Sequence, residues 1–292
     1  MQNNNSLPAS SSLNLSEGMV WAVDKPLGWS SFHVVKKLRG ALLSRVRHAG
    51  IRKLKVGHAG TLDPLASGVM IICSGRATRK IDLLQAGVKE YVAEVALGAT
   101  TPSFDLETPV DATYPTEHIT RELIEEVIPR FTGTIRQIPP AYSAVKVDGR
   151  RAYKAARSGQ EVELKPKTLV IDEIEILGFD TAEMKLTLRI VCSKGTYIRA
   201  LARDIGQALG SGAHLSALRR TRVGDYGIAS ALSVDDAVAD IFRSSIVVDR
   251  DGEEPLVISP ADHIPAPAAT GQHGADQRDI LPYQERIKKT ND

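Results

Sequence analysis

The chain has 292 residues, of which 42% are hydrophobic and 25% charged, a composition typical of a globular protein. Its 37 Lys and Arg residues nearly balance 35 Asp and Glu, so the formal net charge of +2 does not by itself indicate a polyanionic partner. Two cysteines exclude a disulfide framework, no apolar run approaches the roughly 18 residues of a membrane span, and the Asn- and Ser-rich N-terminus lacks the apolar core of a secretory signal. We therefore expect a cytoplasmic protein with no membrane partner.

The first predicted elements follow an N-terminal segment without periodicity. Residues 1–17 are expected to form a disordered arm. An apolar, β-rich run at 19–23 predicts a strand, and the Pro- and Gly-containing residues 25–28 predict the turn that closes it. Ser30 and Ser31 are candidate N-caps of a helix. Its apolar residues recur at near-helical spacing: Phe32, Val35, Leu38 and Leu42.

The later elements point to an α+β protein. A continuous apolar run bounded by glycines predicts a buried strand at 69–73, and alternation predicts half-buried strands at 91–97 and 184–190. One apolar stripe predicts a helix at 197–209. Because the strands alternate as antiparallel ones do, we expect an α+β protein and not a doubly wound parallel sheet.

The predicted domain organisation is one domain at 18–245 between two weakly structured ends. From about residue 246 the composition shifts to Asp, Pro, Ala, Gly and Gln and strand alternation is lost. Residues 246–292 are therefore expected to form a weakly structured tail.

The near-neutral total charge conceals a partition. Eight basic residues and no acidic one lie at 36–55, and seven basic residues with only Asp204 lie at 189–222. Seven acidic residues with only Arg121 lie at 105–126. Any one run fits a solvated face, but two distant basic runs favour a composite nucleic-acid surface, without choosing RNA over DNA. Further basic residues would add to it: Lys146, Arg150, Arg151, Lys154 and Arg157.

The segment KVGHAGTLDPLASG, residues 55–68, is the most informative one. Its glycines allow tight backbone, and Pro64 fixes the chain just after Asp63. A carboxylate on a rigid loop at a strand edge is well placed for catalysis. Local chemistry alone favours a plainer interpretation, in which Asp63 caps a turn and His58 is a hydrogen-bonded loop histidine.

This segment resembles the catalytic loop of the TruB-type tRNA pseudouridine synthases, which is Gly-His-x-Gly-x-Leu-Asp-Pro-Leu-Ala-[Thr/Ser]-Gly. Three further segments are similar to the family's other signatures, in the same order. They are DKPLGWSS at 24–31, IPPAYSAVK at 138–146 with Gly149, Tyr153, Ala156 and Arg157, and CSKGTYIR at 192–199 with GAH at 212–214 and LRRT at 218–221. The resemblance extends from about residue 19 to residue 245.

The resemblance implies the α+β pseudouridine synthase fold, which has a mixed, mostly antiparallel central sheet with flanking helices. It also implies isomerisation of the T-loop uridine at tRNA position 55. The N-glycosidic bond is broken, the uracil rotates, and its C5 is joined to C1′. Asp63 is implied as the catalytic carboxylate, acting by attack on C1′, by attack on the uracil ring or by removal of the 2′ proton. No second carboxylate is required, and no cofactor or metal is implied.

Other site residues follow from the same resemblance. Tyr91 would pack on the target base, although a strand aromatic at this position would also face the core. Arg199 would pair with Asp63 and orient it, whereas by itself it could equally contact phosphate. His58 would enter the space left by the flipped nucleotide.

Three more residues are implied around the base. Tyr197 and Leu218 would line the uracil pocket. Lys25 would lie near the site, and a structural role in the sheet fits it equally well.

The chain departs from the family pattern in two places. The element at 101–108 lacks the family's final Gly, so we expect a different local turn without consequence for the chemistry. Many members end in an RNA-binding PUA-type domain, and the residues after 246 predict no full PUA domain here. The catalytic domain's own basic surface is then expected to bind the T-arm of tRNA, as a monomer and without a protein partner.

Two alternatives remain at this point. An RNA-binding chaperone that folds tRNA, with secondary catalysis, would lose that assistance on charge removal at Arg45 or Arg220 and keep it in Asp63→Asn. A related synthase would act on another RNA site.

Overall fold

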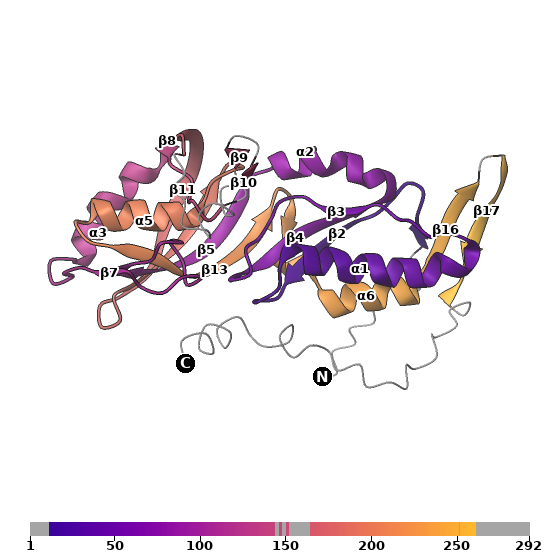
Figure 1. Cartoon of the computed structure of the whole chain (residues 1–292), viewed down its shortest axis with the longest axis horizontal. Coiled ribbons are helices and arrows are strands. Elements are labelled where there is room, and N and C mark those ends of the chain that lie inside the picture. The colour runs from indigo at the N-terminus through magenta and orange to yellow at the C-terminus, as the bar shows by residue number, and fades with distance from the viewer. Residues whose placement is uncertain (1–11, 144–145, 148–149, 152–163, 251, 261–292) are drawn as a thin grey trace, which may run out of the picture. The chain divides into compact units, whose positions relative to one another are not determined.

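The computed structural model describes residues 12–143, 146–147, 150–151, 164–250 and 252–260 (Figure 1). The chain forms two compact units. Unit 1 combines Met1–Gln85 with Tyr226–Asp292, and unit 2 is Ala86–Asp225. Each unit contains helices and mostly antiparallel strand pairs, which confirms the predicted α+β class. No helix in the described part of the chain is long and apolar enough to span a membrane.

The sheet of unit 1 is built on β4 (Ala66–Ser74). Antiparallel partners are β2 (Val20–Lys25) and β3 (Val56–His58), and β15 (Leu232–Ser233) lies parallel to β2. The strands predicted at 19–23 and 69–73 are confirmed as β2 and β4. Almost all of β4 is buried, as its continuous apolar sequence predicts.

Helix α1 (Ser31–Val46) packs against α6 (Val234–Arg243) in the same unit (Figure 1). Ser30 is its N-cap, since the Ser30 side chain accepts a hydrogen bond from His33 N. Three of the four residues in the predicted apolar stripe are buried in the core, namely Val35, Leu38 and Leu42. The fourth, Phe32, is 61% exposed.

A three-stranded sheet in unit 1 corrects part of the sequence prediction. β1 (Ser12–Asn14) lies parallel to β16 (Ser245–Arg250), and β16 pairs antiparallel with β17 (Glu253–Ile258). The expectation that 1–17 and 246–292 lack stable structure was wrong for these strands. β1 has only three residues, too few to show a period, and its partner β16 lies more than 200 residues further along the chain. Residues 1–11 and 261–292 lie outside the described part, and the domain boundaries stay predictions.

Arg45, near the end of α1, is fully buried and not part of a basic surface. Its guanidinium donates hydrogen bonds to five backbone carbonyls, those of Ile241, Phe242, Ser244, Ile258 and Ser259. The charge is compensated by the carbonyl dipoles at the end of α6 and around β16 and β17. The expectation that Arg45 contributes to a basic nucleic-acid surface was therefore wrong.

The sheet of unit 2 has the strand order β13-β5-β12-β11-β8, with every neighbouring pair antiparallel. The predicted strands at 91–97 and 184–190 are confirmed as β5 and β12, and the predicted helix at 197–209 as α5, which packs on β13. The bounds are β5 (Lys89–Leu97), β8 (Gly133–Gln137), β11 (Lys167–Asp180), β12 (Lys185–Cys192), α5 (Ile198–Ala208) and β13 (Ala213–Val223).

Short elements complete the two units. They are η1 (Arg47–Ala49), η2 (Gly75–Lys80), α2 (Ile81–Ala86), β6 (Ala99–Thr100), β7 (Ala112–Thr113), α3 (Arg121–Val127), η3 (Ile128–Phe131), β9 (Lys146–Val147), β10 (Arg150–Arg151), β14 (Tyr226–Gly227) and η4 (Ile228–Ser230).

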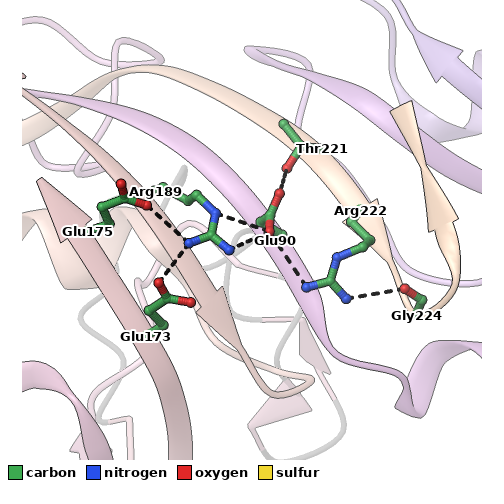
Figure 2. A network of polar contacts seen from close by, with 7 residues as sticks. All are labelled: Glu90, Glu173, Glu175, Arg189, Thr221, Arg222 and Gly224. Atoms are coloured by element: carbon green, nitrogen blue, oxygen red, sulfur yellow. Dashed lines mark hydrogen bonds and ion pairs between the residues drawn. The ribbon is translucent and has the colours of Figure 1, made fainter. Parts of the chain in front are cut away.

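One face of the unit 2 sheet carries a polar network centred on Glu90 (Figure 2). Thr221 donates a hydrogen bond to Glu90, and Arg189 donates two. Arg189 also contacts Glu173 at 2.8 Å and Glu175 at 3.2 Å. The network therefore links β5, β11, β12 and β13 on the face opposite Tyr91.

Candidate functional site

Asp63 lies on the loop between β3 and β4 and begins a tight turn. The Ala66 amide donates to the Asp63 carbonyl at 3.0 Å, and the Gly28 amide donates to the Pro64 carbonyl at 2.8 Å. Asp63 itself is half-buried. The backbone on its C-terminal side is thus held both within the loop and by the turn that follows β2.

Ser31, the first residue of α1, holds the other side of Asp63. Its hydroxyl accepts a hydrogen bond from the Leu62 amide at 2.8 Å and donates one to the Leu62 carbonyl at 2.9 Å. The two N-terminal segments that resemble family signatures, at 24–31 and 55–68, are therefore in direct contact. Such fixation of a loop from several elements is what a positioned carboxylate requires.

Lys25 and His58 flank this loop. Lys25 is fully buried, and its Nζ donates to the carbonyls of Pro26 at 2.9 Å and Trp29 at 2.6 Å. Lys25 therefore holds the turn that supplies Gly28, and its place beside the target base stays a prediction. His58 is half-buried at the end of β3, opposite Ile72.

In unit 2, Tyr91 and Leu218 share one face of the sheet. Tyr91 lies opposite Arg220 and Leu218 lies opposite Ala93, and residues opposite each other on neighbouring strands point to the same side. Tyr91 is buried, so the core-facing part of its prediction holds. Arg220 is 1% exposed, so the expectation that it contributes to a basic nucleic-acid surface was wrong.

Lys89 adds a second buried cation to this face and was missed by sequence reasoning. Its Nζ donates to the Gly87 carbonyl. Burial lowers the pKa of Lys89, and the nearby charge of Arg220 lowers it further. Strand alternation could have predicted that Lys89 shares a face with Tyr91, because it lies two residues before Tyr91 on β5.

Arg199 is buried in the first turn of α5. Its guanidinium donates to the carbonyls of Ser103 at 3.0 Å and Tyr142 at 3.1 Å, and its Nε lies 3.4 Å from Asp105 Oδ2. The side chains of Arg199 and Asp105 are each 6% exposed. Asp105 belongs to the element at 101–108, which sequence reasoning had left out of the site.

The residue before α5 is held by a glutamine that the sequence did not single out. Gln137, at the end of β8, accepts a hydrogen bond from the Tyr197 amide at 2.9 Å and donates one to the Tyr197 carbonyl at 3.1 Å. The Gln137 side chain thus satisfies the amide of Tyr197, the N-cap residue of α5, which provides no side-chain cap of its own.

The predicted site residues thus fall into two groups, one in each unit. Unit 1 holds Lys25, His58 and Asp63, and unit 2 holds Tyr91, Tyr197, Arg199 and Leu218. The roles of these residues and the pairing of Arg199 with Asp63 remain predictions. Within the residues that the structure describes, no three or more His, Cys, Asp or Glu side chains gather as a metal site would require.

The two basic runs differ in their surroundings. In the run at 189–222, Arg189, Arg199, Arg203 and Arg222 each lie within 4.0 Å of a carboxylate, and Arg220 is buried. In the run at 36–55, all basic residues except Arg45 are exposed or half-exposed. Most unneutralised positive charge of the two runs therefore lies in unit 1.

Two family models match consecutive parts of this chain. Residues 47–198 match the N-terminal domain of the TruB family pseudouridylate synthases, and residues 199–251 match the tRNA pseudouridylate synthase B C-terminal domain. The chain therefore belongs to the TruB family of pseudouridylate synthases.

Individual relatives agree with this assignment. tRNA pseudouridine synthase B of Phocaeicola vulgatus is 63% identical over 223 residues, which are 76% of this chain and 93% of the relative. The protein of the same name from Bacteroides thetaiotaomicron is 58% identical over 241 residues, 82% of this chain and 99% of the relative. The structure of a Cbf5-Nop10-Gar1 complex contains a similar chain, with a TM-score of 0.56 and 29% identity over 82% of this chain and 61% of that chain. The expected pseudouridine synthase fold is thereby confirmed.

Proposed function

We propose that this chain is a tRNA pseudouridine synthase that isomerises the T-loop uridine at position 55. The observation that carries the proposal is Asp63 at the Leu-Asp-Pro position of the family motif, on a loop anchored by Ser31 and Gly28. Relatives named tRNA pseudouridine synthase B, 58–63% identical over most of the chain, support the tRNA substrate.

The reaction requires only groups that this chain carries. The C1′–N1 bond breaks, the uracil turns, C5 bonds to C1′, and the proton lost from C5 is balanced by one gained at N1. The Asp63 carboxylate serves as the nucleophile or base in each of the three open roles. Ser31 and Gly28 fix the loop backbone on either side of it, which reduces the entropy lost in reaching the reactive geometry.

The remaining predicted residues would bind and expose the base. Tyr91 and Leu218 share a sheet face on which a flipped uracil would lie, with Tyr197 at the start of α5. His58 would occupy the space that the flipped nucleotide leaves. Arg199, restrained by Asp105 and two carbonyls, would present the rest of its guanidinium to Asp63.

The test is pseudouridine formation in a T-arm hairpin incubated with the purified chain alone, without added metal, cofactor or protein partner. We expect the native protein to convert the T-loop uridine of the hairpin to pseudouridine, and Asp63→Asn to form none. Asp82→Asn, which removes an exposed carboxylate of the same unit, is the matched control and should stay active.

The same variant separates the chaperone alternative. If Asp63→Asn binds the hairpin normally but makes no product, the catalytic assignment stands, and any remaining assistance to tRNA folding measures the second role. Substantial turnover by Asp63→Asn would contradict the assignment. Inactivity on the hairpin with activity on another RNA would favour the alternative substrate.

A further inference from the structure

We propose that the outer face of α1 is a docking surface for the sugar-phosphate backbone of the RNA substrate, with Phe32 as a stacking site for an unpaired base. This proposal rests on the proposed function for the identity of the RNA. The α1 outer face is defined by the exposed residues that recur at three- and four-residue spacing along one side of the helix. They are Phe32, His33, Lys36, Lys37, Gly40 and Ser44.

The charge of this surface favours a polyanion. No acidic residue occurs between Asp24 and Asp63 in the sequence. Lys36 and Lys37 are exposed and form no ion pair with any residue that the structure describes. The positive charge continues beyond the helix through exposed basic residues at Arg47, Arg52, Lys53 and Lys55. An unneutralised run of this kind is the electrostatic footprint of nucleic-acid binding.

Gly40 is the second, independent observation. It lies in the interior of α1, where glycine lowers helix stability relative to alanine. A Cβ built on Gly40 would meet no atom within 4 Å apart from its chain neighbours and the backbone of its own helix, so the packing of the fold does not require a glycine here. A missing side chain in the middle of a basic face permits close approach of a partner's backbone, and Lys36 and Lys37 lie one turn before it.

Phe32 marks the end of the surface nearest the Asp63 loop. Its side chain is 61% exposed, and Leu27, on the turn before α1, is also 61% exposed. The neighbouring Ser31 is bonded to Leu62, and Gly28 to Pro64, so this apolar end adjoins the catalytic loop itself. An exposed aromatic beside a basic track is the arrangement by which proteins bind unpaired nucleotides.

The charge and the position decide between possible occupants. A protein partner would use the exposed Phe32 and Leu27 but has no need of a run without acidic residues. A substrate nucleotide next to the flipped uridine would reach the apolar end while its neighbouring phosphates lie along Lys36, Lys37 and Gly40. RNA therefore accounts for the basic run, for the glycine at position 40 and for the exposed apolar end at Phe32.

The first test compares stability and binding in Gly40→Ala. If Gly40 has no role in RNA binding, alanine should raise the melting temperature and leave RNA binding unchanged. The docking surface predicts that alanine raises the melting temperature and also weakens binding of a fluorescent T-arm hairpin, with a rise in KM and an unchanged kcat. A Kd and KM equal to those of the native protein would overturn the role of Gly40.

The second test uses charge and stacking variants. Lys36→Gln with Lys37→Gln should reduce the slope of log Kd against log salt by about 1.6, since each of the two lost phosphate contacts lowers it by roughly 0.7–0.9. Phe32→Ala should weaken hairpin binding about fivefold or more. The matched controls are Arg121→Gln with Arg130→Gln, which removes two exposed charges from unit 2, and Leu83→Ala, which removes a 74% exposed apolar side chain from unit 1.

The outcomes separate this proposal from the proposed function. An active native protein whose α1 variants bind and react as the controls do would overturn the docking surface and leave the function intact. A native protein that binds the hairpin through α1 but forms no pseudouridine in it would support the surface and contradict the function. Loss of self-association in the α1 variants, with unchanged RNA binding, would assign the face to a second copy of the chain and overturn the proposal.

Discussion

At the scale of single residues, the buried pair of Arg199 and Asp105 shows how a site side chain is restrained. The Arg199 guanidinium donates to the carbonyls of Ser103 and Tyr142 and lies beside the carboxylate of Asp105. Removing the charge of one partner in a buried pair leaves the other uncompensated. Asp105 is therefore expected to position Arg199 without itself touching substrate.

We predict that Asp105→Asn lowers the free energy of unfolding by about 3 kcal/mol and reduces kcat, because Arg199 loses the buried carboxylate that restrains it. KM should change little, since Asp105 binds no part of the RNA in this proposal. Urea unfolding and steady-state kinetics on a T-arm hairpin measure the two effects. Asp111→Asn, an exposed neighbour, is the control, and an Asp105→Asn protein with native kcat would contradict the positioning role.

At the scale of elements, the polar network on the unit 2 sheet makes stability depend on pH. The hydrogen bond from Thr221 and those from Arg189 lower the pKa of Glu90 below its ordinary value, against the opposing effect of burial. A carboxyl with a lowered pKa in the folded state stabilises the protein above its unfolded pKa. That stabilisation is lost as the pH falls through the folded value.

Glu90→Gln should consequently reduce the free energy of unfolding by about 1 kcal/mol near neutral pH. The difference from the native protein should shrink as the pH falls below about 4.5, the ordinary pKa of the group, and vanish once Glu90 is protonated in both states. Urea titrations at several pH values measure this difference in the free energy of unfolding. A difference that is constant down to pH 2 would show that charge at Glu90 does not stabilise the sheet.

Arg45 links helix α1 to the end of α6 and to the C-terminal strands through its hydrogen bonds. Arg45→Met should destabilise the fold by about 3 kcal/mol, because the hydrogen bonds to five backbone carbonyls, three of them buried, are lost. Limited proteolysis should then cut first near β16 and β17. Arg47→Met, which removes an exposed charge just after the same helix, should leave both stability and cleavage unchanged.

At the scale of the whole molecule, each compact unit contains one buried thiol. Cys73 lies on β4 of unit 1 and Cys192 on β12 of unit 2, and burial raises the pKa of each to about 11. Each thiol therefore reports on the opening of its own unit.

We expect iodoacetamide at pH 8 to label neither thiol in the folded protein, at a rate at least about a hundredfold below that in denaturant. Cys192→Ala leaves a reporter in unit 1, and Cys73→Ala leaves one in unit 2. Mass spectrometry across a denaturant series measures the extent of labelling in both variants. Rapid labelling of either variant without denaturant would contradict the burial of that strand.

The sequence was sufficient where the information is local. The strands β2, β4, β5 and β12 and the helices α1 and α5 follow from periodicity, and the loop around Asp63 follows from a contiguous motif. The irregular β11 is interrupted by register shifts, and β1 has three residues, so neither has a regular period to detect.

The misassigned residues depend on distant partners. Arg45 and Arg220 look like surface charges until long-range packing buries them, and Asp105 and Gln137 acquire their roles from residues 94 and 60 positions away, respectively. Charge patterning cannot distinguish an exposed arginine from a buried one. Contacts of this separation are set by the topology of the sheet and not by the segment itself.

The carbonyls around Arg45 also define how the protein can be shortened. Two of the five acceptors belong to Ile258 and Ser259, beyond the part of the chain that the resemblance to the family covers. A chain cut at about residue 245 to retain only the recognised segments would leave this cation inside an apolar core with part of its hydrogen-bonding capacity unfilled. An expression boundary for a minimal active enzyme should therefore be placed after Ser259, and an affinity tag after that residue would leave these contacts in place.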